Sequence, residues 1–105
     1  MQPKMNWTFM SLQILDDVRR GKLTFAEMFP RARAAGFVAY DASDSDAEFA
    51  PREEVLRLCA ENGLQIADYI HWVHLTTPDD AAYRAAGESG CRAARTALAH
   101  GTDKL

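Results

Sequence analysis

Residues 34–41 read AAGFVAYD, and residues 61–68 read ENGLQIAD. Both stretches contain the same junction, in which a helical pattern ends at a glycine, Gly36 or Gly63, and a short apolar run follows at once. Another helical pattern with its own start signals lies between them. Strands that alternate with helices through short turns are typical of parallel βα units. The repeated junction therefore predicts an α/β fold built on a parallel sheet.

Three apolar segments are the expected strands: residues 7–15, 37–41 and 64–75, with an end near His71 as the alternative for the third. Residues 16–22 predict a polar loop after the first strand, and residues 41–50 an acidic loop after the second. Residues 102–105 are expected to open a fourth strand.

Three helices are expected between these segments. The first helix is expected to open at the capping box of Thr24 and Glu27. Because a proline inside a helix removes a hydrogen bond, Pro30 predicts either that this helix bends or that it starts later. The second has Pro51 at its first position. The third follows the sequence TPDD at residues 77–80 and runs to His100, as two helices or one bent helix, since Gly87 and Gly90 weaken its middle.

Composition and charge limit the partners. The chain has 105 residues and a formal net charge of −3, so nucleic acid is not an expected partner. No apolar stretch approaches the ~20 residues that span a bilayer, and no signal-peptide pattern is visible. We therefore expect a cytoplasmic protein without a membrane partner. Cys59 and Cys91 lack metal-ligand spacing and are expected to be buried or half-buried thiols.

The junctions also resemble a known family. The pattern AxxAGFxxYD at residues 32–41 and the stretch EEVLRLCAENGLQIA at residues 53–67 resemble the sugar phosphate isomerase/epimerase family of xylose-isomerase-like barrels. The resemblance covers nearly the whole chain but only the N-terminal part of the family's (β/α)8 TIM barrel, which takes ~250 residues. It implies a single domain, residues 1–105, that supplies about the first three to four strands and is inactive alone.

The resemblance implies a chemistry as well. Members of the family transfer a proton beside a sugar carbonyl, assisted by a divalent metal, manganese or magnesium. Their metal ligands come from the second half of the barrel, so no metal ligand and no cofactor is assigned within this chain. The implied ligand is a small sugar or sugar phosphate. Two positions match the substrate-facing rim: Asp41 at the end of the second strand and His71 at the end of the third.

Asp41, His71, Trp72 and His74 are the candidate substrate-binding residues, and no catalytic residue is identified. Asp41 either binds a sugar hydroxyl or starts a loop by bonding nearby backbone N–H groups. His71 and His74 would point to opposite faces of a continuous strand, which argues against a metal pair; each lines a substrate pocket or has a structural role. Trp72 either stacks on a sugar ring or packs against the protein.

Other chemistry is less apparent in the sequence. Asp68 lies in an otherwise apolar strand, so it needs a partner and is either functional or at the edge of the sheet. No Ser-His-Asp order, nucleophilic thiol or paired-carboxylate motif stands out. Two alternatives to an enzyme remain: a half-barrel that self-associates as a homo-oligomer through its open sheet edge, and a small α/β binding domain.

Overall fold

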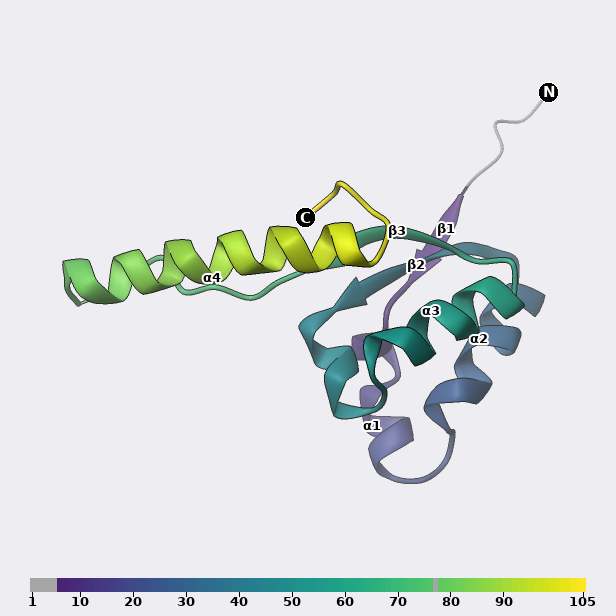
Figure 1. The fold of residues 1–105 in the computed structure, drawn as a ribbon. Helices are drawn as coiled ribbons and strands as arrows, with labels where there is room; N and C mark the ends of the chain where they lie inside the picture. The colour runs from purple at the N-terminus through teal and green to yellow at the C-terminus, as the bar shows by residue number, and fades with distance from the viewer. Residues whose placement is uncertain (1–5, 77) are drawn as a thin grey trace.

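The computed structural model describes residues 6–76 and 78–105 (Figure 1). Helices and strands alternate along most of the chain, as the two glycine junctions predict. The elements are β1 (Trp7–Phe9), the 3-10 helix η1 (Ser11–Gln13), α1 (Leu15–Arg19), α2 (Phe25–Ala34), β2 (Phe37–Ser43), the 3-10 helix η2 (Asp44–Glu48), α3 (Arg52–Glu61), β3 (Gln65–Ile70) and α4 (Asp80–Ala99).

The three strands form one parallel sheet in the order β1-β2-β3. Phe9 lies opposite Tyr40 in the first pair, and Asp41 lies opposite Asp68 in the second. Each strand is therefore added beside the one before it. This arrangement confirms the prediction of parallel βα units.

The end of the chain lies along the free edge of β3. The amide of Tyr69 donates to the carbonyl of Lys104 at 2.9 Å, and the Thr102 hydroxyl donates to the carbonyl of Ala67 at 3.2 Å. Thr102 pairs with Ala67, and Lys104, two residues later, pairs with Tyr69, so residues 102–104 run parallel to β3. They lie where a fourth strand was expected, although this stretch has no strand assignment.

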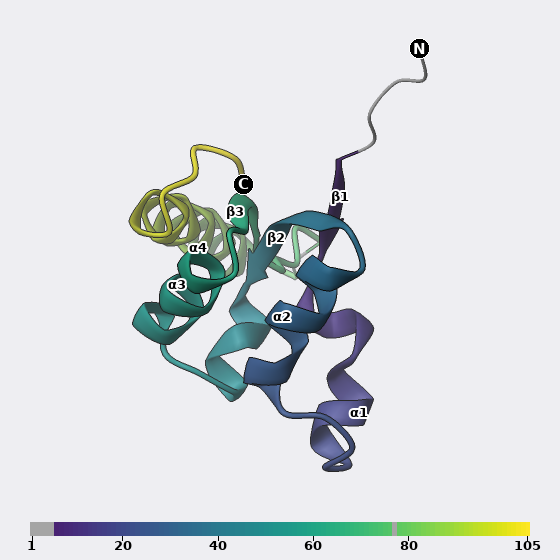
Figure 2. The same ribbon diagram turned by 90° about the vertical axis from the view of Figure 1, so that its right-hand side faces the viewer.

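Helices α2 and α3 lie side by side and cover one face of the sheet (Figure 2). Their apolar side chains enter one core with residues of all three strands, including Phe9, Met28, Phe29, Tyr40, Ala42, Val55, Leu58 and Tyr69. Burial of a large apolar side chain contributes about 1.5–3 kcal/mol, so this cluster is the main stabilising contact. Because side chains alternate along a strand, Thr8, Asp41 and Asp68 lie on the opposite face.

The signals that predicted α2 and the junctions are confirmed. The amide of Glu27 donates to the Thr24 hydroxyl at 3.2 Å, and the Glu27 carboxylate accepts from the Thr24 amide at 2.9 Å. The helix starts at Phe25 and contains Pro30, so the alternative of a later start is wrong. Gly36 and Gly63 both have positive φ angles, 100° and 67°, which favour glycine.

The prediction of a first strand over residues 7–15 is wrong. The strand ends at Phe9, and η1 and α1 occupy the rest of that segment and part of the expected polar loop. The Gln13 side chain accepts from the amide of Met10 at 3.2 Å and so closes a turn directly after β1. Asp16 and Asp17 lie in the first turn of α1, where negative charge favours a helix.

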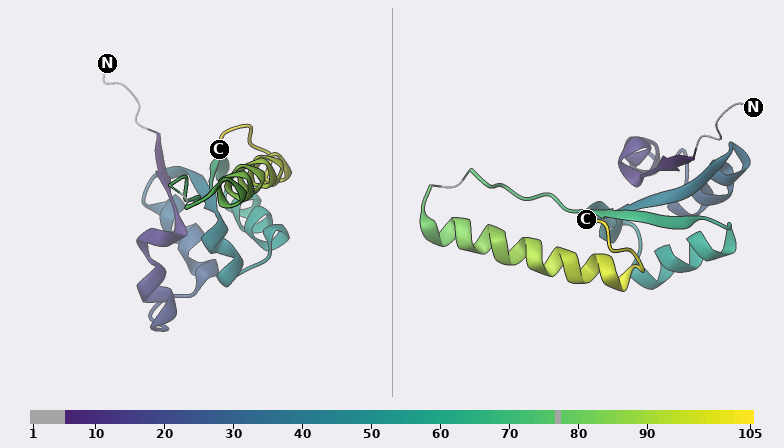
Figure 3. Two further views of the ribbon diagram at one scale, coloured as in Figure 1. Left: turned by 90° about the vertical axis from the view of Figure 1, so that its left-hand side faces the viewer. Right: turned by 90° about the horizontal axis from the view of Figure 1, so that it is seen from above.

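Two further boundaries differ from the expectation. Strand β2 runs to Ser43 and is followed by η2 instead of an irregular loop. Strand β3 ends at Ile70. The prediction of a strand over residues 64–75 is therefore wrong, and the alternative prediction of an end near His71 is confirmed. Residues 71–76 continue without a strand assignment and run alongside α4 (Figure 3).

Helix α4 is one continuous helix although it contains Gly87 and Gly90, so the two-helix alternative is wrong. Its N-cap is Asp79, whose side chain accepts from the amide of Ala82 at 2.8 Å, whereas Thr77 lies outside the described residues. Pro51 was predicted at the first position of the second helix. It is instead the N-cap of α3, one position before the first helical residue. Within the described chain, no helix combines the length and the apolar character needed to cross a membrane.

The two cysteines differ in burial. Cys59 is buried in the core, as expected. Cys91 is exposed on α4, so the prediction of a buried or half-buried thiol is wrong for this residue. The buried face of α4 carries Ala93 and Ala97, and Cys91 is not in register with them.

Candidate functional site

A pair of carboxylates lies on the sheet face opposite α2 and α3. Asp41 of β2 and Asp68 of β3 are direct neighbours in the parallel register. The Thr8 hydroxyl of β1 donates to Asp41 Oδ2 at 2.9 Å, so all three strands contribute to this cluster. Within the described part of the chain, the buried atom Asp68 Oδ1 has no hydrogen-bond partner.

The environment of this pair favours the protonated form of Asp68. Burial raises the pKa of Asp68, and the negative charge of Asp41 and a hydrogen bond with Asp41 raise it further, whereas the charge of Lys104 lowers it. Once protonated, Asp68 can donate to Asp41, which removes the repulsion between the two charges. Asp68 therefore keeps its proton to a higher pH than an isolated aspartate does.

A second group of polar residues begins where β2 and β3 end. Asp44 is the first residue after β2, and His71 is the first after β3. His71 Nδ1 lies 2.5 Å from Asp44 Oδ2, and His71 Nε2 lies 2.8 Å from the Oγ atom of Ser89 on α4. The Tyr69 hydroxyl donates to the other oxygen of Asp44 at 2.6 Å. These contacts form a continuous chain, Ser89–His71–Asp44, with Tyr69 at its end.

The chemistry of Asp44 determines the orientation of the histidine. An ionised carboxylate can only accept hydrogen bonds, so a neutral His71 that donates to Asp44 carries its proton on Nδ1 and has a lone pair on Nε2. In that tautomer, the Nε2 atom accepts a hydrogen bond from the Ser89 hydroxyl. Burial and the bond to Asp44 raise the pKa of Tyr69, so its hydroxyl remains a donor to the carboxylate. The chain is therefore polarised from Ser89 toward Asp44.

A buried aspartate supports the strand ends on the core side. Asp46 accepts from the Ser11 hydroxyl at 2.7 Å, from the Tyr40 hydroxyl at 2.6 Å and from the amide of Ser43 at 3.0 Å. Burial raises the pKa of Asp46, and the bonds from Tyr40 and Ser11 oppose that effect. Asp46 thereby ties the segment after β1 and the end of β2 to η2.

A cavity of about 490 Å³ lies between η2, the start of α3 and the end of α4. Tyr69 lines it, so the cavity adjoins the residue that bonds Asp44. The buried His100 also lines it; its ring packs on Tyr69 with centroids 4.9 Å apart, and its Nδ1 donates to the carbonyl of Thr96 at 2.8 Å. The cavity is therefore close to the strand ends but on the helix-covered side of the sheet.

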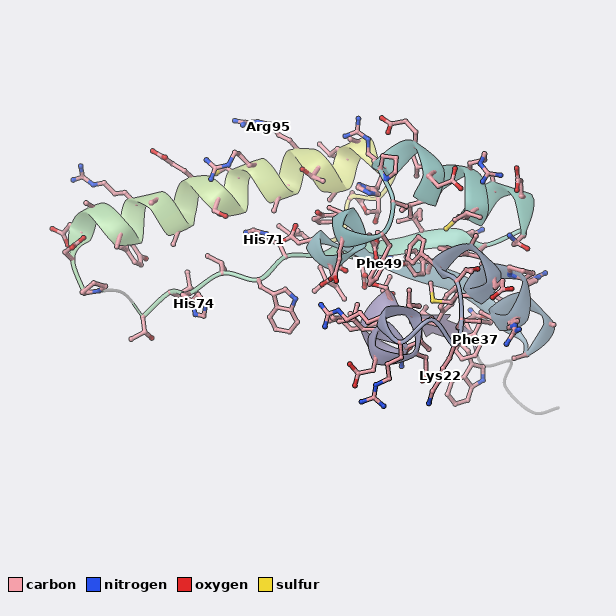
Figure 4. The ribbon with its side chains drawn as sticks, turned by 90° about the horizontal axis from the view of Figure 1, so that it is seen from below. Lys22, Phe37, Phe49, His71, His74 and Arg95 are labelled. Carbon is pink, nitrogen blue, oxygen red and sulfur yellow. The ribbon has the colours of Figure 1, made fainter. Side chains whose placement is uncertain are left out.

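The predicted site residues fall into separate places. Asp41 belongs to the carboxylate pair, whereas His71 follows Tyr69 by two residues and shares Asp44 with it. His74 is exposed further along the segment after β3 (Figure 4), and Trp72 is 66% exposed. The structure thus does not join these four residues in one pocket.

The residues that the structure describes do not by themselves make up a site for the divalent metal that the family resemblance implies. Among residues 6–76 and 78–105, no three side chains of His, Cys, Asp or Glu gather as a metal site requires. The pair of Asp41 and Asp68 supplies only two carboxylates.

Sequence reasoning missed three members of these groups. Asp44 carried a usable signal, because it follows β2 as His71 follows β3, and the ends of adjacent parallel strands meet at one edge. Thr8 required the register between β1 and β2. Ser89 carried no signal, since its position depends on how α4 packs beside the segment after β3.

Comparisons with known proteins leave the family open. No family model, no curated protein and no solved structure matches the chain.

Proposed function

We propose that this chain forms the opening strands of a (β/α) barrel of the sugar isomerase/epimerase kind, in which Asp41 and Asp68 hold a proton beside a sugar carbonyl. The observation that carries the proposal is the carboxylate pair itself. It lies on the face opposite α2 and α3, joins adjacent strands, and has one buried oxygen without a partner in the described chain.

The topology supports a barrel over a doubly wound sheet. A doubly wound sheet has helices on both faces and a reversal of strand order. Here the strands follow in sequence, α2 and α3 share one face, and residues 102–104 lie beside β3. In a barrel, helices form the outer ring and the opposite face points inward. The carboxylate pair would then face the barrel interior.

The chemistry of the pair suits a sugar. With one proton between them, one oxygen can accept a proton from a hydroxyl or an acidic carbon while another donates to the neighbouring oxygen. The Thr8 hydroxyl orients Asp41 for this exchange. A cytoplasmic location belongs to the same proposal, and the two free thiols, one exposed, are consistent with a reducing compartment.

Binding tests this proposal better than turnover, because a barrel site draws residues from several strands. Fructose 6-phosphate and glucose 6-phosphate are titrated into ¹⁵N-labelled protein and followed by amide chemical shifts. We expect shifts at Thr8, Asp41 and Asp68, which disappear in Asp68→Asn and persist in Asp16→Asn, an exposed carboxylate on α1. Absence of shifts on these strands, or equal shifts in both variants, contradicts the proposal.

A further inference from the structure

The Ser89–His71–Asp44 chain lies outside the proposed sugar site and has a chemistry of its own. Its atoms connect in the order that activates a serine: carboxylate oxygen to Nδ1 at 2.5 Å, and Nε2 to Oγ at 2.8 Å. We propose that Ser89 is a nucleophile that accepts acyl groups from small esters, with His71 as its general base and Asp44 as the positioning residue.

The burial of the three residues suits these roles. The His71 side chain is only 15% exposed, so its ring is fixed between its two partners, whereas Asp44 is 41% exposed. Tyr69 occupies the second oxygen of Asp44 and so holds the carboxylate toward the imidazole. Ser89 itself is half-buried, which leaves its hydroxyl within reach of a small molecule.

The helix around Ser89 leaves room for an acyl group. The residues one turn away on the same side are Ala85, Ala86, Arg92 and Ala93, and Gly90 follows Ser89 directly. A Cβ atom built on Gly90 would meet nothing within 4 Å. Three of these four neighbours are alanines and Arg92 is exposed, so a short acyl group such as acetyl meets few large side chains on this face of the helix.

The reaction is a two-step hydrolysis that uses water. The Oγ atom of Ser89 bonds to the ester carbonyl carbon while its proton moves to Nε2 of His71. The bond from that carbon to the alcohol oxygen then breaks, and the alcohol leaves with the proton from Nε2. Water, deprotonated by the same nitrogen, attacks the acylated serine and releases a carboxylic acid. Ser89 regains its proton, so the enzyme ends unchanged.

Covalent labelling with p-nitrophenyl acetate and with a fluorophosphonate tests the proposal, with peptide mapping to locate the adduct. We expect one adduct on Ser89, its loss in Ser89→Ala, and labelling about 100-fold slower in His71→Gln. Ser45→Ala, a change at a half-buried serine of η2, keeps the original rate. Labelling elsewhere only, or equal rates in His71→Gln and the original chain, overturns the proposal.

The role of Asp44 is tested by the pH profile of labelling. An amide in Asp44→Asn can donate to Nδ1 and so favours the tautomer with Nε2–H, which cannot accept the serine proton. We expect slower labelling and a displaced pH profile in Asp44→Asn, whereas Ser45→Ala leaves the profile unchanged. An unchanged profile in Asp44→Asn contradicts a positioning role.

A thiol variant provides an independent readout within one molecule. In Ser89→Cys, His71 can take the proton of the introduced thiol, whereas the natural thiol of Cys91 is exposed two residues away on the same helix. With iodoacetamide at neutral pH, we expect the introduced thiol to react about 10-fold faster than Cys91. Equal or slower alkylation overturns the proposal, and circular dichroism verifies that the variant is folded.

Discussion

At the scale of single residues, three aspartates in or after the strands of the sheet differ in what surrounds them. Asp46 is 3% exposed and accepts three hydrogen bonds, so it is a structural acceptor. Asp44 is more exposed and bonds a histidine. Asp68 is partly buried beside another carboxylate and has an oxygen without a partner in the described chain. Burial and partners therefore separate the structural role of Asp46 from the roles proposed for Asp44 and Asp68.

Replacement of Asp46 should weaken the fold strongly. In Asp46→Ala the buried hydroxyls of Ser11 and Tyr40 lose their acceptor, and each unsatisfied group costs about 1–3 kcal/mol. We expect the free energy of unfolding to fall by about 3 kcal/mol in urea denaturation. Asp16→Ala, at an exposed position, should change it by less than about 0.5 kcal/mol. Equal effects of the two substitutions would show that Asp46 does not support the strand ends.

Asp68 should make stability depend on pH in an unusual direction. Its pKa is raised in the folded protein, so folding binds a proton above the usual carboxyl pKa of 3.8. The free energy of unfolding therefore falls as the pH rises from 3.8 through the raised pKa. Asp68→Asn removes this pH-dependent loss of stability. We therefore expect the variant to have a higher melting temperature at pH 7 than the original chain has. A lower melting temperature at pH 7 would contradict the assignment.

At the scale of elements, success of the sequence prediction depended on whether a local signal existed. The capping box of Thr24 and the glycines at 36 and 63 are local, and the structure has α2 and both junctions where they were predicted. The ends of β1 and β3 had no such signal, because apolar residues continue beyond both. Trp72 and Leu75 are exposed, at 66% and 64%, so their apolar character did not indicate a buried strand.

Two glycine substitutions should have opposite effects. Gly36 has φ of 100°, and alanine there is strained, so we expect Gly36→Ala to destabilise by about 1–2 kcal/mol. Gly87 lies within α4, and an added Cβ meets nothing within 4 Å, so Gly87→Ala should stabilise by about 0.5–1 kcal/mol. Thermal unfolding of both variants measures these changes in stability. The same sign for both changes would argue against the first junction.

At the scale of the whole molecule, the order of the strands links the fold to the proposed function. A sequential parallel sheet with α2 and α3 on one face leaves the other face to Thr8, Asp41 and Asp68. The sequence predicted Asp41 and His71 as residues at strand ends, where barrel residues gather; His71 directly follows β3, whereas Asp41 lies two residues before the end of β2. It missed the pairing of Asp41 with Asp68, which requires the register, and the contact of His71 with Ser89, which requires the packing of α4.

The titration of the two carboxyl groups is the most direct test, because Asp41 and Asp68 interact only if β2 and β3 are parallel in the register described. Side-chain ¹³C NMR of aspartate-labelled protein follows both groups from pH 2 to 8. We predict that Asp68 keeps its proton above the usual pKa of 3.8 and that its midpoint moves toward that value in Asp41→Asn. A midpoint for Asp68 that is the same in the original chain and in Asp41→Asn would contradict both the register and the shared proton.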